Sequence, residues 1–417
     1  MYDVVIASYA FIVRFASLFN KKAKKMLAGQ GKTFSVLAEN RDSQARYIWF
    51  HAASLGEFEQ GRPLIEKIRE EKPEYKILLT FFSPSGYEVR KNYAGADVVC
   101  YLPFDFPSNA RKFLDLAKPE IAIFIKYEFW MNYLNYLKKR NIPTYIISAI
   151  FRPTQIFFRW YGYRYRNVLT DFNWFFVQDE NSLKLLEKFN HHNVTISGDT
   201  RFDRVHQISG QGEKLPHIEK FVQKTEEKQR ILIAGSTWEK DEEILLSFFN
   251  QHPEIKLIIA PHETKESRIT EIVNRLKRPY ILYSQADEKA IEKADCLIVD
   301  CVGLLSSIYR YGEIAYIGGG FGVGIHNVLE AAVYGMPVLF GPNYGKFKEA
   351  KELIAFKGAF SVSSEEDFST RMNNLLAYPE LVQTAGEKAK NYVVNNLGAT
   401  RKIYDKVFTD QRKKLRG

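Results

Sequence analysis

Glycines between an apolar segment and a helical pattern are the first feature of this chain that indicates chemistry. The apolar segment 314–317 leads into GGGFGVG at 318–324, and we expect a helix to start near His326. Glycines let a backbone approach a ligand, and the free N–H groups and dipole of a helix start attract an anion. The pattern predicts a phosphate site, although a purely structural strand-to-helix turn looks the same.

Glu330 adds a second chemical group to this loop. It lies three residues after Asn327, so both fall in the opening turn of the expected helix. There the carboxylate can accept hydrogen bonds from sugar hydroxyls while the helix start holds a phosphate. A strand at 337–340, closed by Gly341-Pro342, completes a β-loop-α-β unit. Together these residues predict a nucleotide-sugar site.

Other loops of the second half also follow expected strands. The hydroxyls and N–H groups of Gly235-Ser236-Thr237 can bind a phosphate or a sugar carboxylate, and plain helix capping is the alternative. Pro261-His262-Glu263 and Asp300-Cys301-Val302-Gly303 follow two further strands. Because ligands bind at the carboxyl ends of parallel strands, we expect these loops at one edge of a sheet.

Glu57 is the most informative acidic residue of the first half. It ends the segment HAASLGE at 51–57, between a strand at 47–50 and a helix predicted for 60–71. Gly56 permits a tight turn, which predicts that Glu57 lies at the mouth of the loop. A carboxylate there can act as general base on an acceptor hydroxyl. The simpler interpretation is a charge that interacts with the helix dipole, and Glu59 fits that interpretation better.

Short apolar runs alternate with helical patterns through both halves, which predicts parallel sheets wrapped by helices. The polar stretch 206–227 marks a linker. We predict an α/β protein with two doubly wound Rossmann-like domains, at 47–210 and 225–395, that face a cleft, followed by a C-terminal helix at 396–417. The expected strands are 47–50, 77–82, 98–102, 121–125, 144–147, 175–177, 194–197, 231–234, 257–260, 280–283, 296–299, 313–317 and 337–340.

Composition narrows the class of protein. A chain of 417 residues with 46% hydrophobic and 26% charged residues suits two globular domains. Three cysteines, Cys100, Cys296 and Cys301, without a CxxC pair argue against a disulfide framework or a zinc site and favour a reducing compartment. The net charge of +10 favours anionic partners such as nucleic acid, lipid or phosphorylated substrates.

Residues 1–46 have the pattern of a membrane-associated helical segment. Residues 4–19 are largely apolar, although Arg14 interrupts them, and four lysines follow at 21, 22, 24 and 25. The run is too short and interrupted for a transmembrane span, and no signal-peptide cleavage site follows. A helix in the membrane interface, with its lysines toward anionic headgroups, is one interpretation. A core helix with a solvated basic end is the other.

Basic and aromatic residues interleave at 152–166 (RPTQIFFRWYGYRYR), and Arg62 and Lys126 are further basic groups. Such a segment can grip RNA by stacking or lie at a lipid interface, but most often its aromatic side chains are buried. No nucleic-acid-binding signature accompanies it, so we expect no nucleic acid partner.

Several motifs occur in an order that resembles one family. The chain resembles the 3-deoxy-D-manno-octulosonic acid (Kdo) transferases of bacterial lipopolysaccharide synthesis. The motifs that carry this resemblance are HAASLGE, EFWMN at 128–132, GDTRFD at 198–203, AGSTWEKDEE at 234–243, and GGGFGVGIHNVLEAA with GMPVLFGP. The resemblance runs from about residue 47 to 345. It implies a GT-B glycosyltransferase that moves Kdo from CMP-Kdo to a lipid A precursor (lipid IVA). It further implies inversion, no metal or other cofactor, and a location at the cytoplasmic face of the inner membrane.

The resemblance also implies roles for individual residues. Glu57 would be the general base, Arg201 would stabilise charge in the transition state, and Glu128 would supply a second carboxylate. Expected acceptor contacts are Ser54, Gly56 and Arg62. Expected donor contacts are Gly235, Ser236, Thr237, Pro261, His262, Val302, Gly303, Leu304, Gly320, Asn327, Val328, Leu329 and Glu330.

Some positions depart from the usual pattern of this family. Lys126 and Leu304 stand where a glutamate is common, and His262 stands where arginine is common. These changes alter the charge balance, and Glu128 can replace the carboxylate missing at 126. No DxD-like acidic pair is evident, which is consistent with a helix dipole and cations rather than Mg²⁺ neutralising the leaving group. A nucleotide-sugar epimerase of the same architecture and a basic RNA-binding protein are the alternatives.

Overall fold

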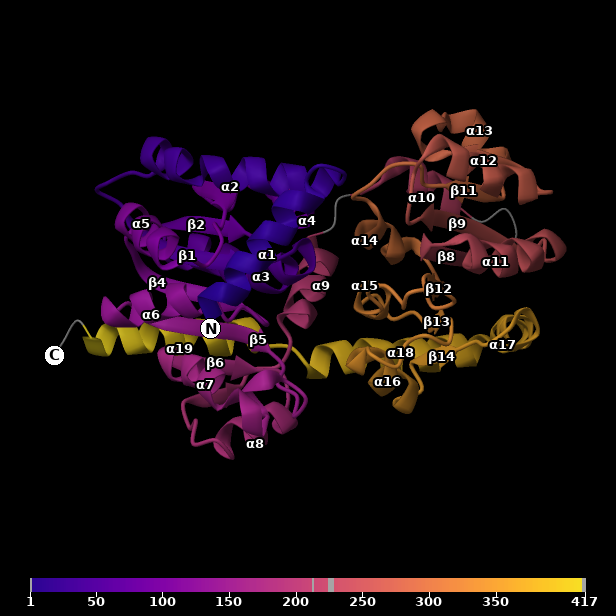
Figure 1. Ribbon diagram of the computed structural model, residues 1–417. Coiled ribbons are helices and arrows are strands. Elements are labelled where there is room, and N and C mark those ends of the chain that lie inside the picture. Colours follow the sequence, from indigo (N-terminus) through magenta and orange to yellow (C-terminus); the bar gives the residue numbers. More distant parts are fainter. Residues whose placement is uncertain (1, 212–213, 224–228, 415–417) are drawn as a thin grey trace. The chain divides into compact units, whose positions relative to one another are not determined.

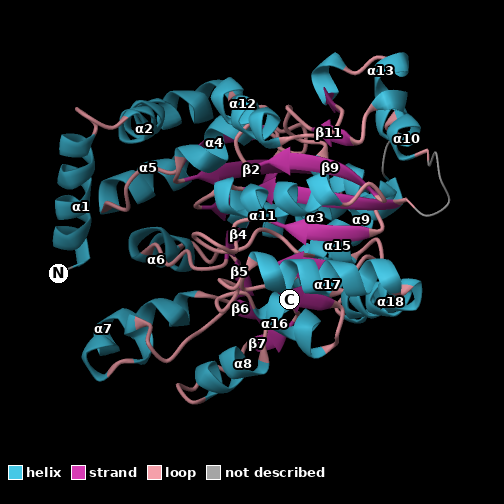
Figure 2. Ribbon diagram, turned by 90° about the vertical axis from the view of Figure 1, so that its right-hand side faces the viewer, coloured by secondary structure: helices cyan, strands magenta, loops and turns pink. Residues whose placement is uncertain are grey.

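The chain forms an α/β protein with two compact units, and both contain a parallel sheet (Figure 1). The computed structural model describes residues 2–211, 214–223 and 229–414. Unit 1 comprises Met1–Arg204 and Leu397–Gly417, and unit 2 comprises Val205–Asn396. Helices and strands alternate along each unit (Figure 2). The predicted class, with two doubly wound domains, is confirmed.

The sheet of unit 1 has the order β3-β2-β1-β4-β5-β6-β7. All seven strands predicted for the first half are present near the expected bounds. They are β1 (Arg46–Ala52), β2 (Tyr75–Phe81), β3 (Val98–Tyr101), β4 (Pro119–Ile125), β5 (Thr144–Ala149), β6 (Trp174–Val177) and β7 (Val194–Ile196). The helices between them are α3 (Leu55–Glu71), α4 (Pro84–Arg90), α5 (Pro107–Ala117), α6 (Met131–Lys139), α7 (Tyr163–Arg166), α8 (Glu180–Glu187) and, after β7, α9 (Thr200–Gln211).

Strand β1 shows why this sheet needs helices on both faces. Tyr47 and Trp49 belong to one hydrophobic cluster, whereas Ile48 and Phe50 belong to another. Side chains alternate between the two faces of a strand, so both faces of β1 are covered. From β1 the chain continues to β2 on one side, and β4 lies on the other. The point between β1 and β4 is therefore the switch point of the sheet, where ligands of doubly wound sheets bind.

Unit 2 repeats this plan with the order β10-β11-β9-β8-β12-β13-β14, and its switch point lies between β8 and β12. Six strands were predicted and are present. The seventh, β14, was missed. The strands are β8 (Arg230–Thr237), β9 (Ile255–Pro261), β10 (Tyr280–Leu282), β11 (Cys296–Ile298), β12 (Ile314–Ile317), β13 (Val338–Phe340) and β14 (Ala359–Ser361). The main helices are α11 (Glu239–Gln251), α12 (Glu266–Arg275), α13 (Glu288–Lys293), α14 (Leu305–Ile308), α15 (Leu329–Ala332), α16 (Lys348–Ala355), α17 (Glu365–Ala377) and α18 (Pro379–Asn395).

The predicted linker 206–227 carries helical structure where it is described. Its first residues belong to α9, and α10 (Pro216–Val222) follows. Ile218 and Phe221 of α10 are fully buried, which explains why this polar stretch is ordered there. Residues 212–213 and 224–228 of the predicted linker lie outside the described residues.

The N-terminal segment forms two helices, α1 (Tyr2–Ala16) and α2 (Lys21–Asn40), that belong to unit 1. Ile6, Ala10 and Val13 of α1 pack in a cluster with aromatic residues that follow β3. At its first turn, the hydroxyl of Tyr2 donates to Asp105 Oδ2 at 2.6 Å. Helix α1 is thus a docked element of the fold on one face.

The opposite face of α1 is apolar and exposed. The side chains of Val4, Phe11, Ile12 and Phe15 are 61–72% exposed, and Leu18 and Phe19 continue this surface. None of the helices in the described part of the chain has the length and hydropathy required to cross a bilayer. Helix α1 thus has a core-facing side, in agreement with the core-helix interpretation, and an unburied apolar side, for which membrane contact stays a prediction.

The C-terminal helix α19 (Ala399–Lys414) returns to unit 1. Its side chains Ile403, Tyr404, Val407 and Phe408 join the same cluster as Ile48 and Phe50. Residues 415–417 of the predicted C-terminal helix lie outside the described residues.

Candidate active site

Glu57 lies at the switch point of unit 1, directly after β1. The expectation that it sits in a loop before a helix at residue 60 is wrong, because α3 already begins at Leu55. Ser54 and Glu57 form a capping box, in which the backbone N–H of Ser54 donates to Glu57 Oε2 at 3.0 Å. Gly56 lies in the first turn and is exposed. Glu57 is consequently held in a defined position at the start of a long helix.

The charge state of Glu57 is set by its surroundings. Burial raises the pKa of its carboxyl above the ordinary 4.5, and the neighbouring Glu128 raises it further. His51, the Ser54 N–H and Lys126 act in the opposite direction. A carboxylate whose pKa lies above its usual range is a better proton acceptor.

Glu128 follows β4, on the other side of the same switch point, and its side chain is buried. Its Oε2 atom lies 3.1 Å from His51 Nε2 and accepts a hydrogen bond from Trp130 Nε1 at 2.6 Å. The structure thus brings Glu57 and Glu128 to one place, although 71 positions separate them in the chain. Their juxtaposition follows from the pairing of β1 with β4.

Buried polar groups surround the His51 ring. Thr80 Oγ1 accepts from Trp49 Nε1 at 2.8 Å and lies 2.8 Å from His51 Nδ1. The Thr80 hydroxyl also donates to the Phe50 carbonyl at 3.3 Å. In the tautomer that carries its proton on Nε2, His51 donates to Glu128. The buried His51 ring therefore helps to orient the Glu128 carboxylate.

Arg201 and Arg62 are engaged with carboxylates of unit 1. Arg201 lies after β7 and donates from Nε and Nη2 to Asp199 Oδ2 at 2.9 and 2.7 Å. Arg62 donates to Glu66 at 2.7 Å and lies 3.7 Å from Glu59. The geometry explains what holds these guanidinium groups but gives no independent support for their predicted roles.

A groove of about 390 Å³ lies next to Glu128. Its walls are aromatic and apolar, apart from Glu128 and Gln155, and include the first residue of α1. The lining residues are Tyr2, Tyr127, Glu128, Phe129, Trp130, Gln155, Ile156 and Phe157. Phe157 of the basic-aromatic segment 152–166 is buried, whereas Trp160 is 87% exposed. The aromatic residues of that segment are therefore only partly buried.

In unit 2, the glycine-rich loop after β12 lies at the switch point, beside the end of β8. The expected helix start is corrected, whereas the predicted contact of Gly320 with the donor stays a prediction. The helix begins at Leu329 rather than near His326 and has only four residues, so its dipole is small. Gly318 and Gly320 pack against backbone of their own chain, because a Cβ on Gly320 would lie 2.5 Å from the Gly341 nitrogen. These glycines serve close packing between loops.

Asn327 and Glu330 come together as predicted. The Asn327 amide donates to Glu330 Oε1 at 3.0 Å, and its Oδ1 accepts from the Leu329 N–H at 3.2 Å. Both side chains are partly exposed, whereas those of Val328 and Leu329 are fully buried. The predicted donor contacts Val328 and Leu329 therefore have almost no accessible surface.

Three rings form a stack at the ends of β8, β9 and β12. His262 lies parallel to Trp238 with ring centroids 4.6 Å apart, and His326 lies 4.6 Å from His262. Trp238 Nε1 donates to His326 Nε2 at 3.2 Å. Burial lowers the pKa of His326 to about 4, with a further contribution from His262. His326 is therefore neutral near pH 7, and the stack offers flat aromatic surfaces rather than a cation at that position.

Acidic residues of α11 hold the loops of unit 2 in place. Asp241 accepts from the Gly319 N–H and from the Tyr316 hydroxyl, both at 2.8 Å. Glu242 accepts from the Thr237 hydroxyl at 2.9 Å and pairs with Arg268. The hydroxyl of Thr237 is thus occupied within the protein. Ser236 adopts a left-handed φ of 54° and is partly exposed.

The remaining predicted donor residues follow the neighbouring strands. Pro261 ends β9 and is buried, Val302 and Gly303 after β11 are exposed, and Leu304 is partly exposed. Gly235 is buried, and a Cβ there would overlap the Tyr309 hydroxyl. Strands β11, β9, β8 and β12 are consecutive in the sheet, so their loops share one edge. Within the described residues, no group of three or more His, Cys, Asp or Glu side chains is arranged to hold a metal ion.

The sequence interpretation assigned no role to several residues that shape these sites. His51, Trp130, Trp238 and His326 lie inside the quoted motifs, so their positions were visible. Their contacts were not, because each partner lies on another strand or loop.

Comparisons with known proteins agree with this geometry. Residues 28–204 match the family model described as 3-deoxy-D-manno-octulosonic-acid transferase (kdotransferase). A 3-deoxy-D-manno-octulosonic acid transferase of Aquifex aeolicus is 28% identical over 338 residues, which cover 79% of this chain and 86% of the relative. The transferase of Chlamydia pneumoniae is 25% identical and covers 94% of this chain and 92% of the relative.

Solved structures with the same fold include UDP-GlcNAc 2-epimerase from Neisseria meningitidis and MurG from Acinetobacter baumannii. The epimerase is 13% identical with a TM-score of 0.61 and covers 87% of this chain and 100% of that chain. MurG is 12% identical with a TM-score of 0.54, and the match covers 87% of this chain and 99% of the MurG chain. At these identities the likeness shows the GT-B-like fold alone, so it does not favour the epimerase alternative. The sequence matches show that the chain is similar to the Kdo transferases.

Proposed function

We propose that this glycosyltransferase transfers Kdo from CMP-Kdo to a lipid A precursor, lipid IVA, with inversion at the anomeric carbon. The observation that carries the proposal is the meeting of Glu57 and Glu128 at the switch point of unit 1. Inverting transfer needs one base for the acceptor hydroxyl and no covalent nucleophile. Glu57 has the raised pKa of such a base, and Glu128 is held by His51 and Trp130 beside it.

In this proposal, Glu57 takes the proton of the acceptor hydroxyl as its oxygen attacks the anomeric carbon of Kdo. The bond from that carbon to the phosphate of CMP breaks, and CMP leaves with the electron pair. The aromatic groove beside Glu128 is the proposed seat of the acceptor. Arg201 would act on developing charge only through the face of its guanidinium that Asp199 leaves available.

The donor would occupy the edge of unit 2 formed by the loops after β8, β9, β11 and β12. Asn327 and Glu330 present polar groups suited to ribose hydroxyls, and the Trp238–His262 stack presents a flat surface suited to a base. Lys265 and Arg268, which follow β9, are paired with Glu263 and Glu242. Contacts to the leaving phosphate would therefore come from loop N–H groups and His262.

The exposed apolar face of α1 would lie in the interface of the inner membrane, on its cytoplasmic side. Lys21, Lys22 and Lys24 at the start of α2 are exposed and would approach anionic headgroups. The enzyme would then bind its amphiphilic acceptor at the surface of the membrane in which the acceptor is embedded.

The test is incubation of the protein with CMP-Kdo and lipid IVA, followed by mass spectrometry of the lipid. Addition of one or more Kdo masses supports the proposal, and retention of product formation in EDTA supports the metal-free route. Unchanged lipid in detergent and in vesicles would refute the assigned acceptor. Activity abolished by EDTA and restored by Mg²⁺ would refute the metal-free route.

A further inference from the structure

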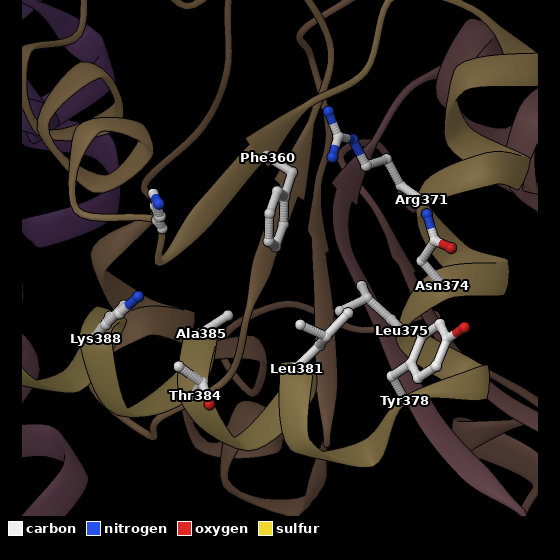
Figure 3. Close-up of a pocket in the computed structure, with 10 residues that line it drawn as sticks. Phe360, Arg371, Asn374, Leu375, Tyr378, Leu381, Thr384, Ala385 and Lys388 are labelled. Atoms are coloured by element: carbon white, nitrogen blue, oxygen red, sulfur yellow. The ribbon is translucent and has the colours of Figure 1, made fainter.

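A second pocket lies in unit 2, between helices α17 and α18 and the last strand, β14 (Figure 3). Its volume is about 280 Å³, and none of the predicted donor or acceptor residues lines it. The lining residues are Lys357, Phe360, Arg371, Asn374, Leu375, Tyr378, Leu381, Thr384, Ala385 and Lys388. The proposed reaction leaves this pocket without a role.

The two helices turn matching stripes of side chains toward the pocket. Each stripe has the i, i+3, i+4, i+7 spacing that normally packs one helix against another. The stripes are Arg371, Asn374, Leu375 and Tyr378 from α17 and its C-cap, and Leu381, Thr384, Ala385 and Lys388 from α18. Thr384 and Ala385 are small, so the second stripe leaves a space in front of the Phe360 ring (Figure 3).

The pocket has an apolar interior and three cationic side chains in its lining. Leu375 and Ala385 are buried, and the phenyl ring of Phe360 faces the space between the helices. Tyr378 lies at the corner where α17 ends and α18 begins, and Leu381 lies one turn beyond. Arg371 and Lys388 are seven and ten residues from that corner, on different helices. Both cations therefore lie away from the corner, and Figure 3 shows them on opposite sides of the Phe360 ring.

The cations that line the pocket keep a positive excess. In the described part of the chain, neither Lys357 nor Lys388 has a carboxylate oxygen within ion-pair distance. Arg371 Nε lies 4.0 Å from Asp367 Oδ1, and its guanidinium lies 5.5 Å from the centre of the Phe360 ring. Three cations thus face one carboxylate.

From this division we infer that the pocket binds the acyl chain and phosphate of an anionic lipid. The chain would fill the space along Phe360, Leu375 and Ala385, and the phosphate would lie among Lys357, Arg371 and Lys388. A small hydrophilic anion would leave the apolar interior unfilled, and a neutral lipid would leave the cations without a counter-charge. The inference is independent of the proposed transferase reaction, because it uses no residue of that site.

Isothermal titration calorimetry with decyl phosphate, below its micelle concentration, tests the inference. We expect saturable binding to the full-length protein, with inorganic phosphate and decyl maltoside at least tenfold weaker (about 1.4 kcal/mol per tenfold). Lys357→Gln and Lys388→Gln should each weaken decyl phosphate binding by about fivefold. Lys390→Gln is the matched control, because Lys390 is exposed on α18 but does not line the pocket.

A second pair of variants separates the pocket from general surface charge. Thr384→Trp should fill the space and abolish binding, whereas Gln383→Trp, at the neighbouring exposed position, should leave binding unchanged. Far-UV circular dichroism and the thermal midpoint verify that both variants fold. Equal binding of decyl maltoside, equal loss in Lys390→Gln, or full binding by folded Thr384→Trp would each overturn the inference.

Discussion

Glu57 combines three properties at one residue: a fixed position in a capping box, partial burial and two charged neighbours of opposite sign. Burial alone would favour the neutral acid, and Glu128 adds to that effect. Lys126 counteracts it, at a position where the resemblance to the Kdo transferases leads us to expect a glutamate. The charge balance around the proposed base is therefore a property of this particular chain, and it can be tested one residue at a time.

Glu57→Gln should abolish transfer while CMP binding is retained. The amide has the shape of the carboxylate but cannot accept the acceptor proton, and removal of a general base typically costs about 10² to 10⁴ in rate. Steady-state transfer measured by mass spectrometry, with CMP calorimetry alongside, gives both values. Glu59→Gln is the control, since Glu59 lies on the same helix as Glu57 and pairs with Arg90 of α4 at 2.7 Å. Wild-type turnover by Glu57→Gln would remove Glu57 from the mechanism.

The pH dependence of kcat/KM should respond in opposite directions to two nearby substitutions. Glu57 must be ionised to act, so activity rises with pH through its pKa, which lies above the ordinary 4.5. Lys126→Met removes a group that lowers this pKa and should move the acid limb to higher pH. Glu128→Gln removes a group that raises it and should move the limb to lower pH, whatever its effect on the maximum. Shifts in the same direction, or none, would show that the limb belongs to another group.

Among the elements, the loops at the switch points do most to define the candidate sites. In unit 2 the four-residue helix α15 is too short to supply the strong dipole that the sequence pattern predicted. Hydrogen bonds from Asp241 to the glycine loop and the pairing of Asn327 with Glu330 hold the region instead. The proposed donor site is built from loop packing and individual side chains rather than from a helix start.

Glu330→Ala should weaken CMP binding, because the lost hydrogen bonds already exist in the ground state. Loss of one or two bonds to a charged acceptor corresponds to about 1.5 to 3 kcal/mol, or roughly tenfold to a hundredfold in Kd. Calorimetry with CMP measures this directly. Glu313→Ala is a comparison on the same unit, since Glu313 lies 3.5 Å from Arg230 at the start of β12, away from these loops. Equal CMP affinity in Glu330→Ala and wild type would show that Glu330 does not bind the donor and only pairs with Asn327.

Helix α1 has two faces, and substitutions on the outer face alone separate membrane contact from folding. The double variant Phe11→Ser/Phe15→Ser changes side chains that are 72% and 62% exposed and leaves the packed residues intact. Losing two phenyl groups from the membrane interface should weaken binding to anionic vesicles about 10²-fold or more. Vesicle flotation measures it, and CMP affinity should not change. Trp160→Ser/Tyr161→Ser is the comparison, and if only that variant detached, the segment 152–166 would be the membrane contact.

At the scale of the whole molecule, the chain leaves unit 1 through α9, forms unit 2 and returns for its last helix. Asp203 binds the returning chain just before α19, because its carboxylate accepts hydrogen bonds from the N–H groups of Gly398 and Thr400 at 2.7 and 2.6 Å. The core of unit 1 is thus completed only after unit 2 has been synthesised. The two units carry separate sheets, so a perturbation can be assigned to one or the other.

Ile403→Ala should destabilise unit 1 by about 2 to 5 kcal/mol, because Ile403 is fully buried in its core. CMP should instead stabilise unit 2 by mass action, if that unit holds the donor. Thermal unfolding followed by calorimetry should therefore show one transition lowered by the substitution and another raised by CMP. Lys402→Ala, at an exposed neighbouring position, should leave both transitions in place. A single transition that moves with both treatments would mean that the units unfold together.

Thirteen of the fourteen strands in the described residues could be predicted, most of them because a strand buried on both faces is an uninterrupted apolar run that needs no knowledge of its partners. Strand β14 was missed because its two apolar residues, Ala359 and Phe360, are followed by Ser361 and do not form such a run. Helix starts were less well predicted. With the capping box of Ser54 and Glu57, α3 begins five residues earlier than predicted, and α15 begins at Leu329 and has only four residues.

The residue types of the candidate sites were likewise determined by the sequence alone, since the motifs display Glu57, Glu128, Asn327 and Glu330 in the printed order. Only the tertiary structure decided which of them act together. Parallel pairing of β1 with β4 brings Glu57 to Glu128, and a strand from elsewhere in the chain brings Thr80 to His51. The physical reason is that side-chain hydrogen bonds, burial and the resulting pKa shifts depend on distances in space, which local patterns of residues do not contain.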